Sequence, residues 1–198
     1  MNATTTVKLK DGTEVLIRPM TSADLERSLA FFRALPEEDR ACLRRDVTKL
    51  EVVQDRMREM EDGSVKRLVG LVGDEIVADG ALELAHYGWE RHVSELRLIV
   101  ARPYQHKGLG VLMARALYEV ADTAGIEQIV VRMMASQTAA RSIFRKLGFR
   151  DEAVLDDYLK DCQGRKQDLL LMRCKLEDLW QQYEEYIHQL DGRGFEMD

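Results

Sequence analysis

The segment SELRLIVARPYQHKGLGVLMARAL, residues 94–117, joins a strand-like run to a helix-like run through a polar turn with two glycines. From Gly108 to Ala124 the apolar residues recur with the period of a helix. A helix N-terminus has unpaired N–H groups and a partial positive charge, and glycines let a phosphate approach the backbone closely. The turn therefore predicts an anion cradle. On spacing alone, glycines that serve only a tight turn are an equal alternative.

Two common nucleotide-binding motifs do not fit this turn. A dinucleotide fingerprint would need a third glycine at residue 113, where the chain has Met113. The Walker A pattern G-x-x-x-x-G-K-[ST] does not occur in the sequence. The missing third glycine therefore argues against a nicotinamide-dependent enzyme, which is one alternative hypothesis for this chain.

Apolar patterns along the chain predict an α+β domain. Strands are expected at residues 14–19, on both sides of the Gly73–Asp74 turn within 65–86, and at 92–101, 127–135, 153–160 and 167–176. Helices are expected at 21–35, 36–45, 49–63, 108–124 and 138–147, with Pro36 in the first turn of the second. The predicted sheet is mostly antiparallel. Residues 176–190 carry one more apolar stripe at helical spacing.

Composition narrows the class of protein. The 198 residues carry a net charge of −6, which argues against a general nucleic-acid binder. The three cysteines form no C-x-x-C pair and the four histidines no H-E-x-x-H pair, so we expect neither a disulfide framework nor a metal site. Without a signal-like or membrane-spanning apolar run, a cytoplasmic protein with no membrane partner is the expectation.

Three motifs in the right order resemble the GCN5-related N-acetyltransferase (GNAT) superfamily. QHKGLG at 105–110 fits the family signature Q/R-x-x-G-x-G/A. VVRMMASQTAARSIFRKLGF at 130–149 resembles the family's fifth strand and the helix that ends in K-x-G-F. DGTEVLIRP at 11–19, followed by two helices, resembles its opening. Residues 11–49 and 155–176 are similar to the acetyltransferase domain of bacterial protein-lysine acetyltransferases.

The resemblance implies a GNAT domain at residues 8–175, followed by an amphipathic helix and tail at 176–198. Its fold would be a mixed, mostly antiparallel sheet with splayed central strands and flanking helices. Its function would be transfer of an acetyl group from acetyl-CoA, the co-substrate, to a primary amine. A protein lysine, a protein N-terminus and a small amine stay open as acceptors. The C-terminal helix either covers the sheet or forms a homodimer.

The resemblance also implies which residues bind acetyl-CoA. The thioester arm would pair with backbone near the end of the fourth family strand, and the pyrophosphate would lie on the turn that follows. Side chains of Gln105 and Lys107 would assist, and Gln137 would contact the pantetheine arm. The expected binding residues are Leu98, Ile99, Val100, Gln105, His106, Lys107, Gly108, Leu109, Gly110, Gln137 and Phe144.

Acetyl transfer needs a base, because a primary amine is mostly protonated near neutral pH. Glu95 is the leading candidate: alternation in its strand puts Glu95, Arg97 and Ile99 on one face, and a carboxylate there is costly unless it is paired or faces a cleft. Histone-type family members carry their base at a corresponding place. Glu83 is the second candidate. A purely structural ion pair of Arg97 with either glutamate is the alternative.

The general acid is where the sequence departs from the family. Many members have a tyrosine where this chain has Phe144, which has no proton to give. The thiolate can leave without a protein acid, since a thiol of pKa about 8.5 is a tolerable leaving group. Tyr158 or Tyr104 is a possible substitute. The third explanation is a non-catalytic acyl-CoA-binding module of the same fold, which is the alternative function.

Overall fold

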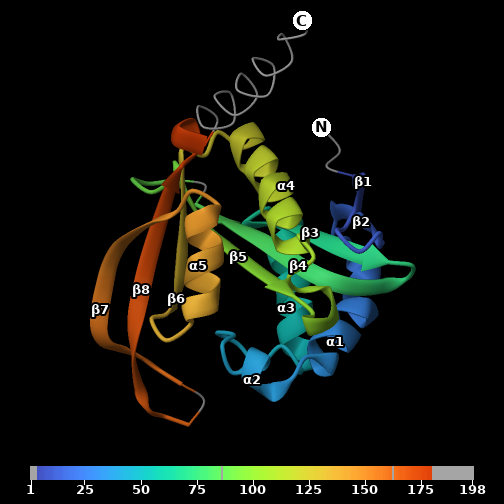
Figure 1. The fold of residues 1–198 in the computed structure, drawn as a ribbon, viewed down its shortest axis with the longest axis horizontal. Helices are drawn as coiled ribbons and strands as arrows, with labels where there is room; N and C mark the ends of the chain where they lie inside the picture. Colours follow the sequence, from blue (N-terminus) through green and yellow to red (C-terminus); the bar gives the residue numbers. More distant parts are fainter. Residues whose placement is uncertain (1–3, 86, 162, 180–198) are drawn as a thin grey trace, which may run out of the picture.

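The computed structural model describes residues 4–85, 87–161 and 163–179. Figure 1 shows one twisted sheet with helices on both faces. The strands are β1 (Thr5–Lys8), β2 (Glu14–Pro19), β3 (Val65–Val72), β4 (Glu75–Leu84), β5 (Val93–Val100), β6 (Gln128–Met134), β7 (Arg150–Lys160) and β8 (Lys166–Lys175). The helices are α1 (Leu25–Ala34), α2 (Glu37–Arg40), α3 (Leu50–Glu61), α4 (Leu109–Thr123) and α5 (Thr138–Lys146), with short 3-10 turns at Ser22–Asp24 and Arg102–Tyr104.

The sheet has the order β1-β2-β3-β4-β5-β6-β8-β7. Neighbouring strands are antiparallel except β5 and β6, which are parallel and connected through α4. The expected mixed, mostly antiparallel sheet is thereby confirmed. Each predicted helix and strand between residues 14 and 175 has a counterpart, although the helix expected at 36–45 covers only Glu37–Arg40.

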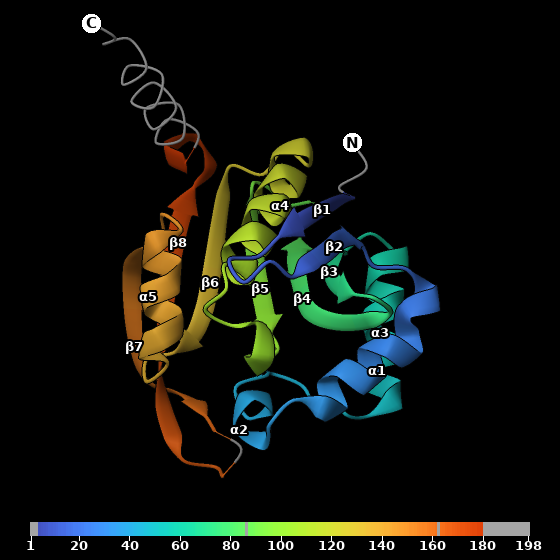
Figure 2. The same cartoon turned by 45° about the vertical axis from the view of Figure 1, so that its right-hand side comes forward.

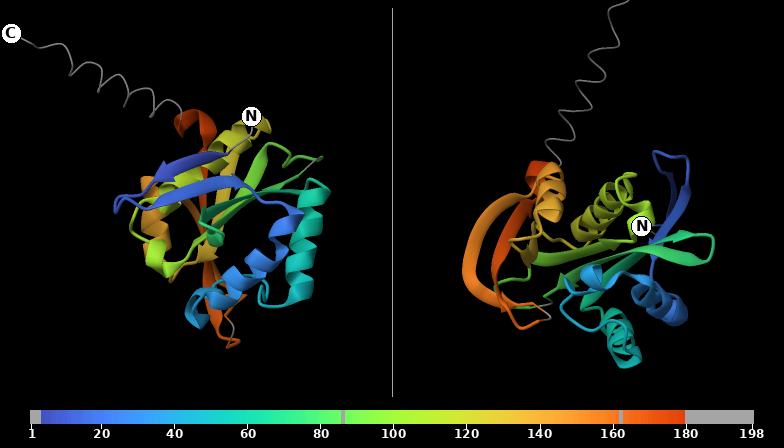
Figure 3. Two further views of the ribbon diagram at one scale, coloured as in Figure 1. Left: turned by 90° about the vertical axis from the view of Figure 1, so that its right-hand side faces the viewer. Right: turned by 60° about the horizontal axis from the view of Figure 1, so that its bottom comes forward.

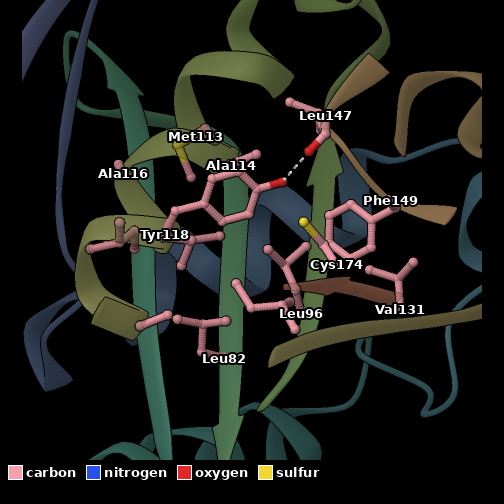
Figure 4. Close-up of a cluster of buried hydrophobic side chains, with 14 of the residues drawn as sticks. Leu82, Leu96, Met113, Ala114, Ala116, Tyr118, Val131, Leu147, Phe149 and Cys174 are labelled. Atoms are coloured by element: carbon pink, nitrogen blue, oxygen red, sulfur yellow. Dashed lines mark hydrogen bonds between the residues drawn. The ribbon is translucent and has the colours of Figure 1, made fainter. Parts of the chain in front are cut away.

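Two hydrophobic clusters hold the helices on opposite faces of the sheet (Figure 3). On one face α4 and α5 pack over β4, β5, β6 and β8, and the buried Tyr118 hydroxyl donates a hydrogen bond to the Leu147 carbonyl at 3.2 Å (Figure 4). On the other face α1 and α3 pack over β3 and the start of β4 around Phe32 and Val53. The same cluster extends to Ile99 and Ala101, at the end of β5 and just after it.

Helix α4 lies close to the sheet because β4 has a glycine beneath it. A Cβ atom built on Gly80 would lie 2.7 Å from Leu117 Cδ1, closer than side chains tolerate. Gly80 thus leaves room for Leu117 of α4 to pack directly on β4.

Three features differ from the sequence-based expectations or lie outside the description. Strand β1 was not predicted; it pairs antiparallel with β2 and forms the sheet edge. Pro36 precedes the first residue of α2 as its N-cap instead of lying in its first turn. Of the expected C-terminal helix, Leu176 is buried in the domain's own core, and residues 180–198 lie outside the described residues.

Candidate active site

Strands β5 and β6 separate soon after they begin (Figure 2). They are paired only over Val93–Gln128, Ser94–Ile129 and Glu95–Val130. The Ala101 N–H donates to the Val77 carbonyl on β4 at 2.9 Å. Because backbone groups alternate along an antiparallel strand, those of Leu98 and Val100 point the other way, toward β6. The splay thus leaves β5 with a backbone edge that an extended ligand can pair with.

The loop after β5 delivers a row of N–H groups to the start of α4. Its backbone is left-handed at His106 (φ 60°) and at Gly108 (φ 95°), which is the N-cap of α4. Among the described residues, Gln105, Val111 and Leu112 donate the loop's backbone hydrogen bonds. The N–H groups of residues 106–110 lie between these donors, at a helix N-terminus where anions bind.

The two side chains expected to help at this loop have partners within the protein. Gln105 Nε2 donates to the Val100 carbonyl at 2.9 Å. Lys107 Nζ lies 2.8 Å from Asp11 Oδ2, and its hydrogen bond is the main cause that lowers the pKa of Asp11 to about 2. The Lys107 carbonyl also accepts from the Lys10 N–H, so the β1–β2 turn braces the loop. The backbone N–H groups of residues 106–110 are therefore donors that do not depend on these two side chains.

On the sheet face opposite α4, Glu95 lies at the last residue of β5 that pairs with β6, where the splay begins. Its side chain is 8% exposed and is held by two arginines. Arg132 on β6 donates through Nε at 2.9 Å and Nη2 at 2.6 Å, and Arg44, between α2 and α3, also donates to both carboxylate oxygens. Burial raises the pKa of Glu95, but the hydrogen bonds from Arg132 and Arg44 outweigh it and leave that pKa below its usual value. Glu95 is therefore ionised at neutral pH.

Glu83 lies beside Glu95, as alternation predicted. The two residues are register partners on β4 and β5. Arg97 joins them, with Nη2 at 2.6 Å from Glu83 Oε1 and Nε at 3.9 Å from Glu95 Oε1. The ion pair proposed as the structural alternative is thus present. Glu83 is the more accessible carboxylate, with 35% of its side chain exposed.

The residues of the second motif pack locally. Gln137, the N-cap of α5, accepts a hydrogen bond from the Met134 N–H at 2.9 Å, which leaves its amide nitrogen as a donor. The Phe144 ring is half-buried and meets Phe149 edge-on, with 5.2 Å between centroids. Phe144 therefore contributes packing at the place where a tyrosine would contribute a hydroxyl.

A cavity of about 520 Å³ lies between α2 and the end of the β7–β8 hairpin. Its acidic residues are largely paired, since Arg102 contacts Glu38 and Asp39, and Arg165 contacts Asp161. Met134 also lines it, two residues beyond Arg132 on β6. Residues two apart share a face of a strand and lie roughly 7 Å apart, so the cavity continues the Glu95 side of the splay. A smaller cavity, about 400 Å³, lies at the opposite end around His92 and Glu127.

The family described as "Acetyltransferase (GNAT) domain" matches residues 14–150. The chain belongs to the GNAT acetyltransferases. Its splayed parallel strands and the loop at the start of α4 are thus the GNAT features that the sequence motifs predicted. Among curated proteins none matches the chain significantly.

Solved GNAT structures share the fold at low sequence identity. The GNAT domain of S. lividans PAT has a TM-score of 0.72 at 16% identity, and the match covers 87% of this chain and 97% of that one. Mycobacterium smegmatis RimJ in complex with CoA-disulfide has a TM-score of 0.73 at 19% identity, and the match covers 89% of this chain and 88% of that one. Ribosomal-protein-alanine N-acetyltransferase from Brucella melitensis has a TM-score of 0.70 at 23% identity, and the match covers 81% of this chain and 99% of that one.

Sequence reasoning missed the two arginines that hold Glu95. Arg132 had a detectable signal, because it alternates with Val131 and Met133 on the strand predicted to flank the splay. Arg44 had none, since it follows α2 and reaches Glu95 only through the fold. Within the described ranges, no group of His, Cys, Asp and Glu side chains could hold a metal, and no helix is long and apolar enough to cross a membrane.

Proposed function

We propose that this GNAT protein transfers an acetyl group from acetyl-CoA to a primary amine by direct attack in a ternary complex. The observation that carries the proposal is the end of β5–β6 pairing at Glu95 and Val130, followed by the N–H row at residues 106–110. The first feature offers backbone to an extended thioester arm and the second offers donors to a pyrophosphate. In the family, acetyl-CoA occupies the corresponding places.

The transfer itself forms one N–C bond and breaks one C–S bond. The neutral amine attacks the thioester carbon, the carbonyl oxygen gains charge, and CoA leaves as a thiolate. The amine proton passes, directly or through water, to the carboxylate pair Glu95 and Glu83. Arg97 contacts both members, with Nη2 at 2.6 Å from Glu83 Oε1 and Nε at 3.9 Å from Glu95 Oε1. Glu83 is the member of this pair that solvent can reach, whereas Glu95 is buried and held by arginines.

No protein acid is assigned to the leaving thiolate. Phe144 packs against Phe149, and the Tyr104 ring lies 5.5 Å from Lys107 Nζ, at the loop. The thiolate of a thiol with a pKa near 8.5 can leave without a protein acid. Phe144 is also the observation that favours the second candidate, a non-catalytic acyl-CoA-binding module.

Turnover separates the two candidates. Purified protein is mixed with acetyl-CoA and a panel of small amines, lysine peptides and peptide N-termini, and free CoA thiol is titrated. An acetyltransferase releases thiol only when an acceptor is present, and the Glu95→Gln, Glu83→Gln double variant releases much less. Binding of acetyl-CoA without acceptor-dependent thiol release would establish the binding module instead.

Two further expectations complete the proposal. A homodimer is tested by sedimentation of the full chain and of a chain ending at Leu176, since only the longer chain would then dimerise. A cytoplasmic setting is tested by fractionating cells that produce the protein.

A further inference from the structure

The carboxylate pair lies among more positive than negative charge. Three guanidinium groups, from Arg44, Arg97 and Arg132, contact the two carboxylates of Glu95 and Glu83. Three positive and two negative charges leave one positive charge. The three arginine side chains are 35%, 36% and 41% exposed, so the surplus charge faces solvent instead of being closed into the core.

The glutamates leave donor capacity in this cluster unused. Each guanidinium has five N–H groups, whereas Arg132 uses Nε and Nη2 on a single oxygen of Glu95. Arg97 Nε is buried and, among the described residues, has no hydrogen-bond partner. Burial lowers the pKa of Arg97, although the Glu83 carboxylate partly offsets this. A further anion would therefore gain charge-assisted hydrogen bonds that the protein does not already make.

The cluster also lies where an acceptor has to arrive. Glu95 and Arg132 face each other across the opening between β5 and β6, on the side away from α4. The 520 Å³ cavity is lined by Met134, which lies two residues beyond Arg132 on the same face of β6. An acceptor that moves from this cavity to the splay passes Arg132.

We infer that the acceptor carries a carboxylate close to the amine that is acetylated, and that Arg132 with Arg97 binds that carboxylate. The fork of an arginine matches a planar carboxylate, which it can bind through two parallel N–H···O bonds. The same surplus charge disfavours a second cation on the acceptor, which counts against polyamines. The inference rests on the proposed transferase function and names its substrate class.

Two kinds of acceptor present this chemistry, and matched pairs distinguish them. The first arm compares free amino acids with their decarboxylated amines: lysine with 1,5-diaminopentane, and phenylalanine with phenethylamine. The second arm compares peptides whose N-terminal residue is followed by Asp or Asn. In at least one arm, we expect kcat/KM for the member with the carboxylate to be about tenfold or more higher than for the member without it. A preference in the first arm identifies a free amino acid as the acceptor, and a preference in the second arm identifies a protein N-terminus.

Variants assign the preference to the cluster. Arg132→Gln should bring the ratio within each pair close to one, and Arg132→Lys should restore part of it. Arg173→Gln is the matched control, because Arg173 lies on the same sheet face but pairs with Glu152 and Gln128. It should leave the ratio unchanged. Neutral members that react as well as acidic ones in both arms would overturn the inference.

A binding measurement keeps this inference separate from the proposed activity. The melting temperature of the protein with CoA is recorded with each acceptor pair. A larger rise with the carboxylate member, lost in Arg132→Gln and kept in Arg173→Gln, supports the inference even if no thiol is released. Equal shifts within every pair contradict it. Failure of thiol release with all acceptors counts only against the transferase function.

Discussion

Glu95 on β5 and Arg132 on β6 form an ion pair, 2.6 Å between Oε2 and Nη2, across the point where the two strands separate. The pair lies on one face of the sheet where the splay begins, and the backbone of Leu98 and Val100 faces the opening beyond it. Arg44 joins the same carboxylate from the segment between α2 and α3. The N-terminal helical region and both halves of the sheet therefore meet at one carboxylate.

The glycine loop can be tested without disturbing the fold. A Cβ on Gly110 would meet only Val100 Cγ2, at 3.9 Å, so Gly110→Ala should keep or slightly raise the melting temperature. The added methyl group would nevertheless obstruct a pyrophosphate on the loop. We expect a several-fold weaker Kd for acetyl-CoA by calorimetry.

Gly108→Ala is the companion variant, because Gly108 has a φ of 95°. Placing a Cβ at this left-handed position should cost about 1–2 kcal/mol of unfolding free energy as well as affinity. Unchanged acetyl-CoA affinity in both variants would remove the loop from the binding site.

The ion pairs of Glu95 predict a pH dependence of stability. Because its pKa is lowered in the folded protein, Glu95 stabilises the fold above its unfolded pKa of about 4.3, and this contribution is lost as pH falls through the lower folded pKa. Between pH 6 and pH 3 the wild type should therefore lose more unfolding free energy than Glu95→Gln does. Denaturant titrations across this range measure the difference, and parallel curves for the two proteins would refute it.

A buried charge cluster under α3 should matter for stability alone. Asp79 accepts from Arg56 at 2.8 Å and from Arg67 at 2.7 Å, and all three side chains are under 10% exposed. Asp79→Ala leaves two buried guanidinium groups without a counter-charge and should destabilise by about 3–5 kcal/mol. Asp74→Ala is the control, since Asp74 is 94% exposed in its pair with Arg27 and should change stability by less than about 1 kcal/mol. Similar losses in both variants would contradict the assignment.

Phe144→Tyr tests whether the chemistry lacks an acid. The thiolate is expected to leave unassisted, so kcat should stay within a few-fold of wild type while the melting temperature falls slightly. A rise in kcat of tenfold or more would show that protonation of the leaving group limits the wild-type enzyme. Steady-state kinetics with the best acceptor provides the measurement.

The sequence anticipated what local pattern determines. Alternation in residues 94–100 placed Glu95, Arg97 and Ile99 on one face, and the structure confirms this: Ile99 packs with the α1–α3 cluster and Leu96 with the α4 cluster. The loop and helix at 105–124 were recognisable because glycine positions and helical period are local signals. Strand β1 was not recognisable, because its four residues, TTVK, include one apolar residue and so carry little apolar alternation.

What the sequence lacked was the pairing of distant side chains. Arg44 and Glu95 are 51 positions apart, and only the path of the chain after α2 brings them together. The charge of the site depends on the same kind of pairing. Glu38 and Asp39 pair with Arg102, whereas the splay carries more arginines than glutamates.

Acetyl transfer to an amine at the splay between β5 and β6 is tested by incubating the protein with the acceptor panel and acetyl-CoA whose acetyl group is isotopically labelled. The acceptors are then analysed by mass spectrometry. We expect a labelled, acetylated amine in equal amount to free CoA thiol, with both reduced in Gly110→Ala at limiting acetyl-CoA. Acetyl-CoA that binds but stays intact with every acceptor would contradict it.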